Sequence, residues 1–193
     1  MESALFVPSG TMANLLAMLG HCDRRGQEVV VGSSSHIYLW EQGGAAQFGG
    51  VHTRPVRNLD DGTFCLSELR NVIQDDKDPH TTSTNLVCIE NTHNSSGGRV
   101  LPIHWLRELV MTCSALHLPV HCDGARLLHS AVALAVEPHE LLEGVESATL
   151  CLSKGLGAPV GSCLVGSHHL VSRARRIRKG LGGGMRQTGG DII

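Results

Sequence analysis

Two residues that could do chemistry stand at the ends of apolar segments. Lys154 follows the apolar run 148–152, and Asp123 closes the apolar run 120–122. A lysine at the end of a buried strand can have its pKa lowered by burial and can form a Schiff base with an aldehyde. A carboxylate beside a pyridine nitrogen keeps that nitrogen protonated, since at ~4 Å and an effective dielectric of ~20 the attraction is roughly 4 kcal/mol. The alternative for Asp123 is a structural ion pair with Arg126.

A third element of the pattern is Ser9-Gly10-Thr11, at the predicted start of a helix. Unpaired N–H groups and hydroxyls at a helix N-terminus can hold a phosphate dianion. Alone, the segment is as well explained by an ordinary helix cap. With Lys154 and Asp123, however, it completes the parts of a pyridoxal 5'-phosphate site, and the sequence predicts that cofactor.

Other polar residues are weaker candidates. His36 begins a predicted helix and can stack on a cofactor ring or act as an acid or base, although most of the twelve histidines should be surface residues. His80 lies in a predicted loop. The segment 90–94 ends a predicted strand, where ligands of open α/β sheets usually bind. Arg186 follows three glycines on an arm that could bring it near an anion.

Composition limits the class of protein. The 193 residues are 41% hydrophobic with a net charge of −2, so the chain has no general attraction to nucleic acid or to anionic membranes. The basic run 173–179 is interpreted as a solvated helix face. Seven cysteines without a CxxC motif predict reduced, buried thiols. The sequence has no apolar segment long enough for a membrane span and no signal-peptide pattern at its start, so we expect a cytoplasmic (cytosolic) protein without a membrane anchor.

Strand-like and helix-like segments alternate along the chain. Strands are predicted at 28–31, 51–56, 85–90, 119–122, 147–152 and 161–165, and helices at 11–22, 37–48, 66–73, 103–116, 127–136 and 168–179. Strands separated by helices of this length form right-handed βαβ units. The predicted fold is therefore α/β, with a mainly parallel sheet flanked by helices.

Several segments together resemble the low-specificity L-threonine aldolases. They occur in the family's order, and the two that contain Asp123 and Lys154 are very specific. The segments are 6–14, 36–44, 90–94, 123–126, 153–162 and 182–187.

The resemblance implies the large domain of the aspartate aminotransferase type (fold type I), pyridoxal 5'-phosphate as cofactor, and cleavage of L-threonine or L-allo-threonine to glycine and acetaldehyde. It also implies a role for each matching residue. Lys154 would bind the cofactor aldehyde, His36 would stack on the ring, and Asp123 would contact the ring nitrogen. Gly10 and Thr11 would bind the phosphate, and His80 would be a second active-site histidine. Arg126 and Arg186 would bind the substrate carboxylate. Arg126 would also lie near the phenolic oxygen, and Arg186 would reach the active site of its own or of a neighbouring subunit.

Family members also carry an N-terminal stretch and a C-terminal small domain that this sequence does not match. We therefore expect residues 1–193 to form most of one cofactor-binding large domain. The alternatives are a non-catalytic remnant of such an enzyme, or another lyase or aminotransferase of the same fold. The family also implies an amino-acid substrate and a homo-oligomer, usually a tetramer.

Overall fold

A computed structural model describes residues 1–186 of the chain. Seven strands form one sheet in the order β1-β7-β6-β5-β4-β2-β3. The strands are β1 (Ser3–Val7), β2 (Gln27–Gly32), β3 (His52–Val56), β4 (Ser83–Glu90), β5 (Val120–Asp123), β6 (Ser147–Cys151) and β7 (Ser162–Gly166). Every pairing between β3 and β6 is parallel, which confirms the predicted mainly parallel sheet.

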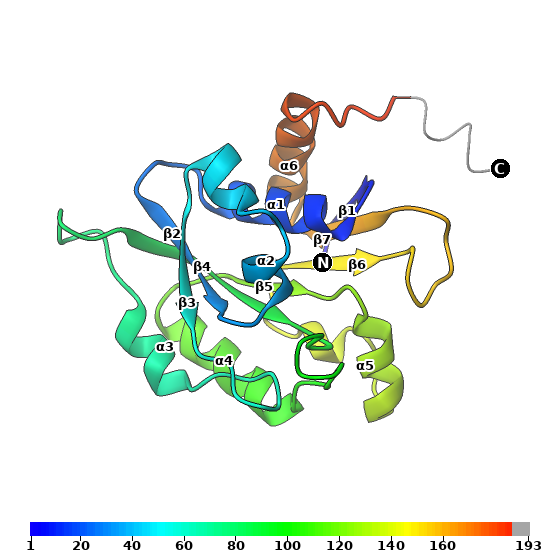
Figure 1. Ribbon diagram of the computed structural model, residues 1–193, viewed down its shortest axis with the longest axis horizontal. Coiled ribbons are helices and arrows are strands. Elements are labelled where there is room, and N and C mark those ends of the chain that lie inside the picture. The colour runs from blue at the N-terminus through cyan, green and yellow to red at the C-terminus, as the bar shows by residue number, and fades with distance from the viewer. Residues whose placement is uncertain (187–193) are drawn as a thin grey trace.

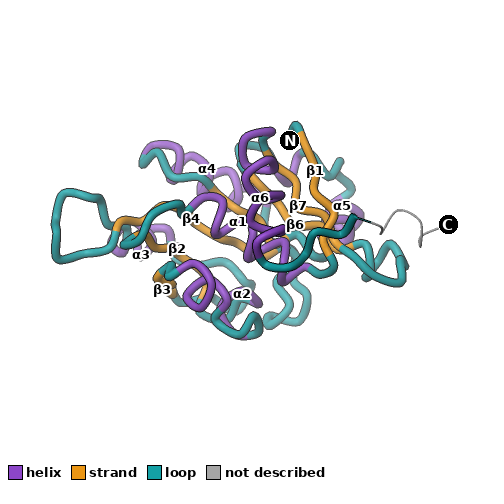
Figure 2. Tube along the Cα trace, turned by 90° about the horizontal axis from the view of Figure 1, so that it is seen from above, coloured by secondary structure: helices purple, strands orange, loops and turns teal. Residues whose placement is uncertain are grey.

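Helices cover both faces of this sheet. They are α1 (Gly10–His21), α2 (His36–Leu39), α3 (Leu66–Val72), α4 (Ile103–Ala115), α5 (Leu127–Leu134) and α6 (His168–Gly180). Helices α1 and α6 lie on one face, and α3, α4 and α5 lie on the other (Figure 1). In the view from above, α1 and α6 overlap the strands of the sheet (Figure 2).

The structure adds two features at one edge of the sheet that the sequence analysis did not predict. Strand β7 pairs antiparallel with β6, and β1 pairs antiparallel with β7. Two reversals leave β1 running in the same direction as β6. The start of α1 therefore lies at the edge of the sheet where the parallel strands end.

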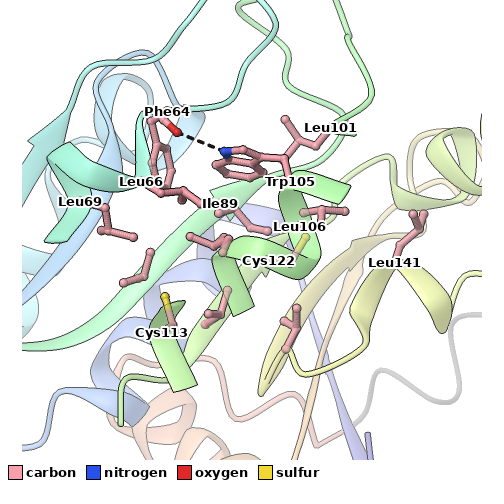
Figure 3. Close-up of a cluster of buried hydrophobic side chains, with 14 of the residues drawn as sticks. Phe64, Leu66, Leu69, Ile89, Leu101, Trp105, Leu106, Cys113, Cys122 and Leu141 are labelled. Carbon is pink, nitrogen blue, oxygen red and sulfur yellow. Dashed lines mark hydrogen bonds between the residues drawn. The ribbon is translucent and has the colours of Figure 1, made fainter. Parts of the chain in front are cut away.

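The larger core lies between the sheet and helices α3, α4 and α5 (Figure 3). Leucine, isoleucine and valine side chains fill most of it, which agrees with the low aromatic content. Its one aromatic pair is Phe64 and Trp105, with ring centroids 5.0 Å apart in an edge-to-face arrangement. The Trp105 indole N–H donates to the Phe64 carbonyl at 3.1 Å, so the buried nitrogen is satisfied.

The prediction of one continuous helix over 37–48 is wrong. Helix α2 ends at Leu39, and a π-helical turn follows at Ala45–Gly49. Between them, Gln42 and Gly43 have φ values of 56° and 61°, in the left-handed region that ends a right-handed helix. This break separates α2 from the turn and leaves Glu41 buried beneath it.

The cysteine prediction is confirmed, because all seven are free thiols and five of them are buried. The interpretation of 173–179 as a solvated face needs one correction. Arg178 is buried, and its guanidinium donates to the carbonyl of Phe6, so this residue ties α6 to β1. No helix within residues 1–186 is both long and apolar enough to cross a membrane.

A buried carboxylate supports the end of the sheet opposite the ends of the parallel strands. Glu28 is fully buried, and its oxygens accept hydrogen bonds from Arg54 at 2.8 Å and from Thr84 at 2.8 Å. Burial opposes ionisation, but the bonds from Arg54, Thr82 and Thr84 outweigh it and hold the pKa of Glu28 below its usual value. Because the folded pKa is lowered, this group stabilises the fold above about pH 4.5 and loses that effect as the pH falls through the folded pKa.

Arg54→Met is expected to lower the free energy of unfolding by about 3 kcal/mol, because it leaves the Glu28 carboxylate buried and unpaired. Urea unfolding at pH 7 measures this change. Lys77→Met, which breaks the exposed pair with Asp75, should change the free energy of unfolding much less than Arg54→Met, because solvent screens that pair. Equal losses in the two variants would contradict a special role for the buried pair.

Candidate active site

A cleft of about 410 Å³ opens at the edge of the sheet where β4, β5 and β6 end. The start of α1 and the loop after β6 complete its walls. Six predicted site residues line this cleft, namely Gly10, Thr11, His36, Asp123, Arg126 and Lys154. The chain brings them together from positions up to 144 residues apart, because parallel strands end at a common edge.

One wall of the cleft is the N-terminus of α1. Ser9 caps this twelve-residue helix, and its hydroxyl accepts the N–H of Met12 at 3.2 Å. A Cβ atom at Gly10 would lie 2.9 Å from the sulfur of Cys151, closer than such contacts normally come. The glycine therefore lets the helix start pack directly against the end of β6, with its first N–H groups beside the cleft.

Asp123 lies on the floor of the cleft, at the end of β5. It is 3% exposed, and its two oxygens accept hydrogen bonds from the Asn14 amide at 2.9 Å and the Ala125 N–H at 3.1 Å. Burial, and then the charge of Glu90, raise the pKa of Asp123 above its usual value. Arg126 donates instead to the Asn94 side chain at 3.3 Å. The alternative of an ion pair between Asp123 and Arg126 is thus not what the structure shows.

His36 lies opposite this carboxyl and is paired with a second one. Its Nδ1 is 3.0 Å from Glu41 Oε1, and its backbone N–H donates to Glu90 at 2.7 Å. The hydrogen bond to Glu41 raises the pKa of His36, against the opposing effect of partial burial. Burial raises the pKa of Glu41. Both side chains line the cleft, and the imidazole is the more exposed of the two, at 35% against 3%.

Glu41→Gln is expected to lower the pKa of His36 by about one pH unit, because a neutral amide replaces the carboxylate that favours the imidazolium. NMR titration of the His36 ring protons checks this. Glu143→Gln, which changes an exposed carboxylate far along the chain, is the matched control and should leave the His36 titration unchanged.

Two functional residues, Asn14 and Glu41, were not predicted from the sequence as site residues, and Glu90 was predicted only as part of the candidate segment 90–94. Asn14 is 1% exposed, and its amide donates both to Glu41 at 2.8 Å and to Asp123 at 2.9 Å. Glu90 accepts the N–H groups of His36 and Asn94 and so holds both sides of the cleft rim. A sequence signal existed for Asn14, since it is a polar residue on the otherwise apolar, buried face of α1.

Three expectations about the site differ from the structure. Lys154 lines the cleft but lies on an exposed turn, so the expected burial of its amine is wrong. His80 lies in the loop between α3 and β4, with its side chain 89% exposed and paired with Asp78. That loop precedes β4 and projects from the sheet on the side away from the loop that follows β6 (Figure 1), so this chain does not bring His80 to its own cleft. Arg186, the last described residue, is exposed and is not among the cleft-lining residues.

The cluster of His36, Glu41 and Asp123 also has donor atoms that could suit a metal ion, since one atom of each lies within 4.8 Å of the others. The N–H bonds of Asn14 already occupy one oxygen of each carboxyl group. His36 uses its Nδ1 on Glu41. These bonds occupy one oxygen of each carboxyl group and Nδ1 of His36, while the other oxygen of Glu41 has no hydrogen-bond partner.

The amino-acid sequence of the chain is similar to those of known proteins. The model of the beta-eliminating lyase family matches residues 1–192. The chain is 47% identical over 189 residues to low-specificity L-threonine aldolase 1 of Arabidopsis thaliana, covering 97% of this chain and 53% of that protein. It is 46% identical over 188 residues to the low-specificity L-threonine aldolase of Escherichia coli, covering 97% and 55%. The chain thus spans about half the length of these curated relatives.

A solved structure shows the same fold. The threonine aldolase of Leishmania major superposes with a TM-score of 0.81 at 22% identity, over 93% of this chain and 52% of that one. The aromatic aminotransferase of Pyrococcus horikoshii shares the fold too, with a TM-score of 0.72 at 16% identity, over 94% of this chain and 48% of that one, as the predicted type of fold requires. From the family model and these relatives, the chain belongs to the beta-eliminating lyase family, whose matching members include the low-specificity L-threonine aldolases.

Proposed function

We propose that this chain binds pyridoxal 5'-phosphate in the cleft and serves the cleavage of L-threonine or L-allo-threonine to glycine and acetaldehyde. The observation that carries the proposal is the position of Asp123, a buried carboxyl that faces the same cleft as the amine of Lys154 and the N-terminus of α1. The family relationship supports the reaction, since the relatives in Arabidopsis and E. coli are named for it.

The residues present fit this cofactor. Three buried carboxyl groups, Glu41, Glu90 and Asp123, line the cleft, and one buried oxygen of Glu41 has no hydrogen-bond partner. Such a floor favours a ligand that presents a positively charged N–H group. The start of α1, at the wall of the same cleft, favours a phosphate. A protonated pyridine that carries a phosphate has both features.

Each residue then has a distinct task. Lys154 supplies the amine that binds the aldehyde covalently, and Asp123 holds a proton on the ring nitrogen. When bound, pyridoxal phosphate supplies an electron-accepting ring that stabilises negative charge at the substrate Cα. His36 is positioned to cover the ring and to accept the proton of the β-hydroxyl group, and its bond to Glu41 raises its basicity.

The remaining tasks concern the substrate. Once the hydroxyl proton has left, the bond between Cα and Cβ breaks, the aldehyde departs, and Cα takes up a proton. Arg126 lines the cleft, and its guanidinium is available for the substrate carboxylate. His80 and Arg186 do not line this chain's own cleft. Their predicted roles therefore require that they reach the cleft of a neighbouring subunit, as they could in a homo-oligomer. The homo-oligomer and the cytosolic location remain predictions.

The test is the visible spectrum of the chain mixed with pyridoxal phosphate, before and after adding glycine, followed by an assay for acetaldehyde from L-threonine. We expect an absorption band that shifts with glycine, and acetaldehyde released in step with glycine. Pyruvate and ammonia from serine, or a keto acid from threonine, would instead identify another lyase or an aminotransferase. A folded chain with no band would support the interpretation as a non-catalytic remnant.

A further inference from the structure

A continuous series of buried and partly buried hydrogen bonds runs from His21, at the end of α1, to Asp123 in the cleft. His21 Nε2 lies 3.0 Å from Ser147 Oγ, and Ser147 Oγ lies 2.9 Å from His121 Nδ1. His121 Nε2 lies 3.2 Å from the Asn14 side-chain oxygen. Asn14 in turn contacts Asp123. The proposed reaction does not use His21, His121 or Ser147 directly, yet His121 and Ser147 are fully buried.

Chemistry determines how the Asn14 amide is oriented. One terminal atom lies 2.8 Å from a Glu41 oxygen and 2.9 Å from an Asp123 oxygen, and only an NH₂ group donates to both. The other terminal atom is then the carbonyl oxygen. It accepts from the Thr149 hydroxyl at 2.7 Å and from His121 at 3.2 Å. All the hydrogen-bonding capacity of this amide is used.

The same reasoning determines the state of His121. Because Asn14 Oδ1 can only accept, His121 Nε2 carries the proton. Burial lowers the pKa of His121 to about 3 and that of His21 to about 4, so both rings are neutral near pH 7. His121 Nδ1 therefore bears a lone pair and accepts the Ser147 O–H. The Ser147 oxygen in turn accepts the N–H of His21.

We propose that His121, oriented by Ser147 and His21, is a positioning residue that directs both N–H bonds of Asn14 toward Asp123 and Glu41. If the Asn14 side-chain amide were flipped by half a turn, its oxygen would face the carboxyl groups of Asp123 and Glu41. Asp123 would then lose a donor that favours its charged form, the form that holds a protonated ring nitrogen. The inference rests on the proposed function for its consequence in catalysis, but the orientation itself concerns only this chain.

The first measurement is ¹⁵N NMR of the histidine-labelled protein without cofactor. We expect His121 to be neutral and protonated at Nε2 at pH 7. A ring protonated at Nδ1, or a charged ring, would overturn the proposal. In either case Nδ1 would carry a proton and could not accept the hydrogen bond from Ser147. This measurement uses the unmodified chain, so it does not depend on any variant's folding.

The second measurement is the pKa of the Asp123 carboxyl, by ¹³C NMR of the same cofactor-free protein. His121→Phe keeps a planar ring but removes the N–H, and it should raise the pKa of Asp123 by about one pH unit. His121→Gln offers a replacement N–H and should return part of that change. Ser130→Ala is the matched control, since Ser130 is equally buried but bonds to Asn91, outside the series.

An unchanged pKa of Asp123 in folded His121→Phe would overturn the proposal, as would equal changes in His121→Phe and Ser130→Ala. Urea unfolding of each variant establishes that it is folded. If pyridoxal phosphate failed to bind the unmodified protein, the proposed function would fall, whereas the NMR results would still decide the role of His121.

Discussion

Lys154→Ala is expected to abolish covalent attachment of pyridoxal phosphate and to reduce the release of acetaldehyde by at least about 1000-fold. The reason is that Lys154 is the amine that this chain presents to the cleft beside Asp123, and alanine has no nucleophile. Borohydride reduction of the loaded protein, followed by mass spectrometry of its peptides, measures the attachment directly. The peptide that contains residue 154 should carry the added mass in the parent chain and lack it in the variant.

Lys179→Ala provides the matched control for this prediction. Lys179 is exposed in the last turn of α6 and is not among the residues that line the cleft. The control should keep both the attachment and the rate of the parent chain. Cofactor mass found on another lysine, with the rate retained in Lys154→Ala, would show that the assignment of the amine is wrong.

Asp123→Asn is expected to weaken the binding of pyridoxal phosphate by roughly 1000-fold. The variant keeps the size of the side chain and an oxygen for the Asn14 amide but removes the charge that faces the ring nitrogen. At ~4 Å and an effective dielectric of ~20, that charge contributes roughly 4 kcal/mol. Titration of the chain with pyridoxal phosphate, followed by absorption, gives the dissociation constant.

Asp78→Asn tests whether loss of any acidic residue has the same effect. Asp78 is exposed, in the loop between α3 and β4, and should give the affinity of the parent chain. If the dissociation constant of Asp123→Asn stays within about twofold of that of the parent chain, the charge interaction is contradicted. That result would leave Asp123 with a structural role only.

The sequence alone predicted the fold well where periodicity was strong. The segment 103–116 has an apolar face at helical spacing, and the structure has α4 at Ile103–Ala115. Prediction from the sequence failed where the secondary structure depends on pairing with a distant segment or on a local turn. Strand β1 has only five residues and exists because β7 pairs with it from the other end of the chain. The region 37–48 looks helical in composition, but the left-handed Gln42 and Gly43 interrupt it.

The same distinction applies to the site. Residues that face the cleft because they end strands or begin a helix, such as Asp123, Lys154 and Gly10, could be predicted from sequence. Asn14 could not, since its importance comes from contacts with Glu41 and Asp123, which are 27 and 109 positions away. His80 matches the family in sequence, but its loop precedes β4 and therefore lies away from this chain's own cleft, so its predicted role stays a prediction.

The pairing of β1 with β7 also has a consequence for how the protein folds. Residues 3–7 pair with residues 162–166, so one wall of the cleft depends on a contact that spans most of the chain. Loop closure over such a separation is entropically costly, and contacts of this kind form slowly. The central parallel strands can assemble earlier, from neighbouring βαβ units. We therefore expect the wall of the cleft formed by the start of α1 to be completed late, when the first strand docks on the last.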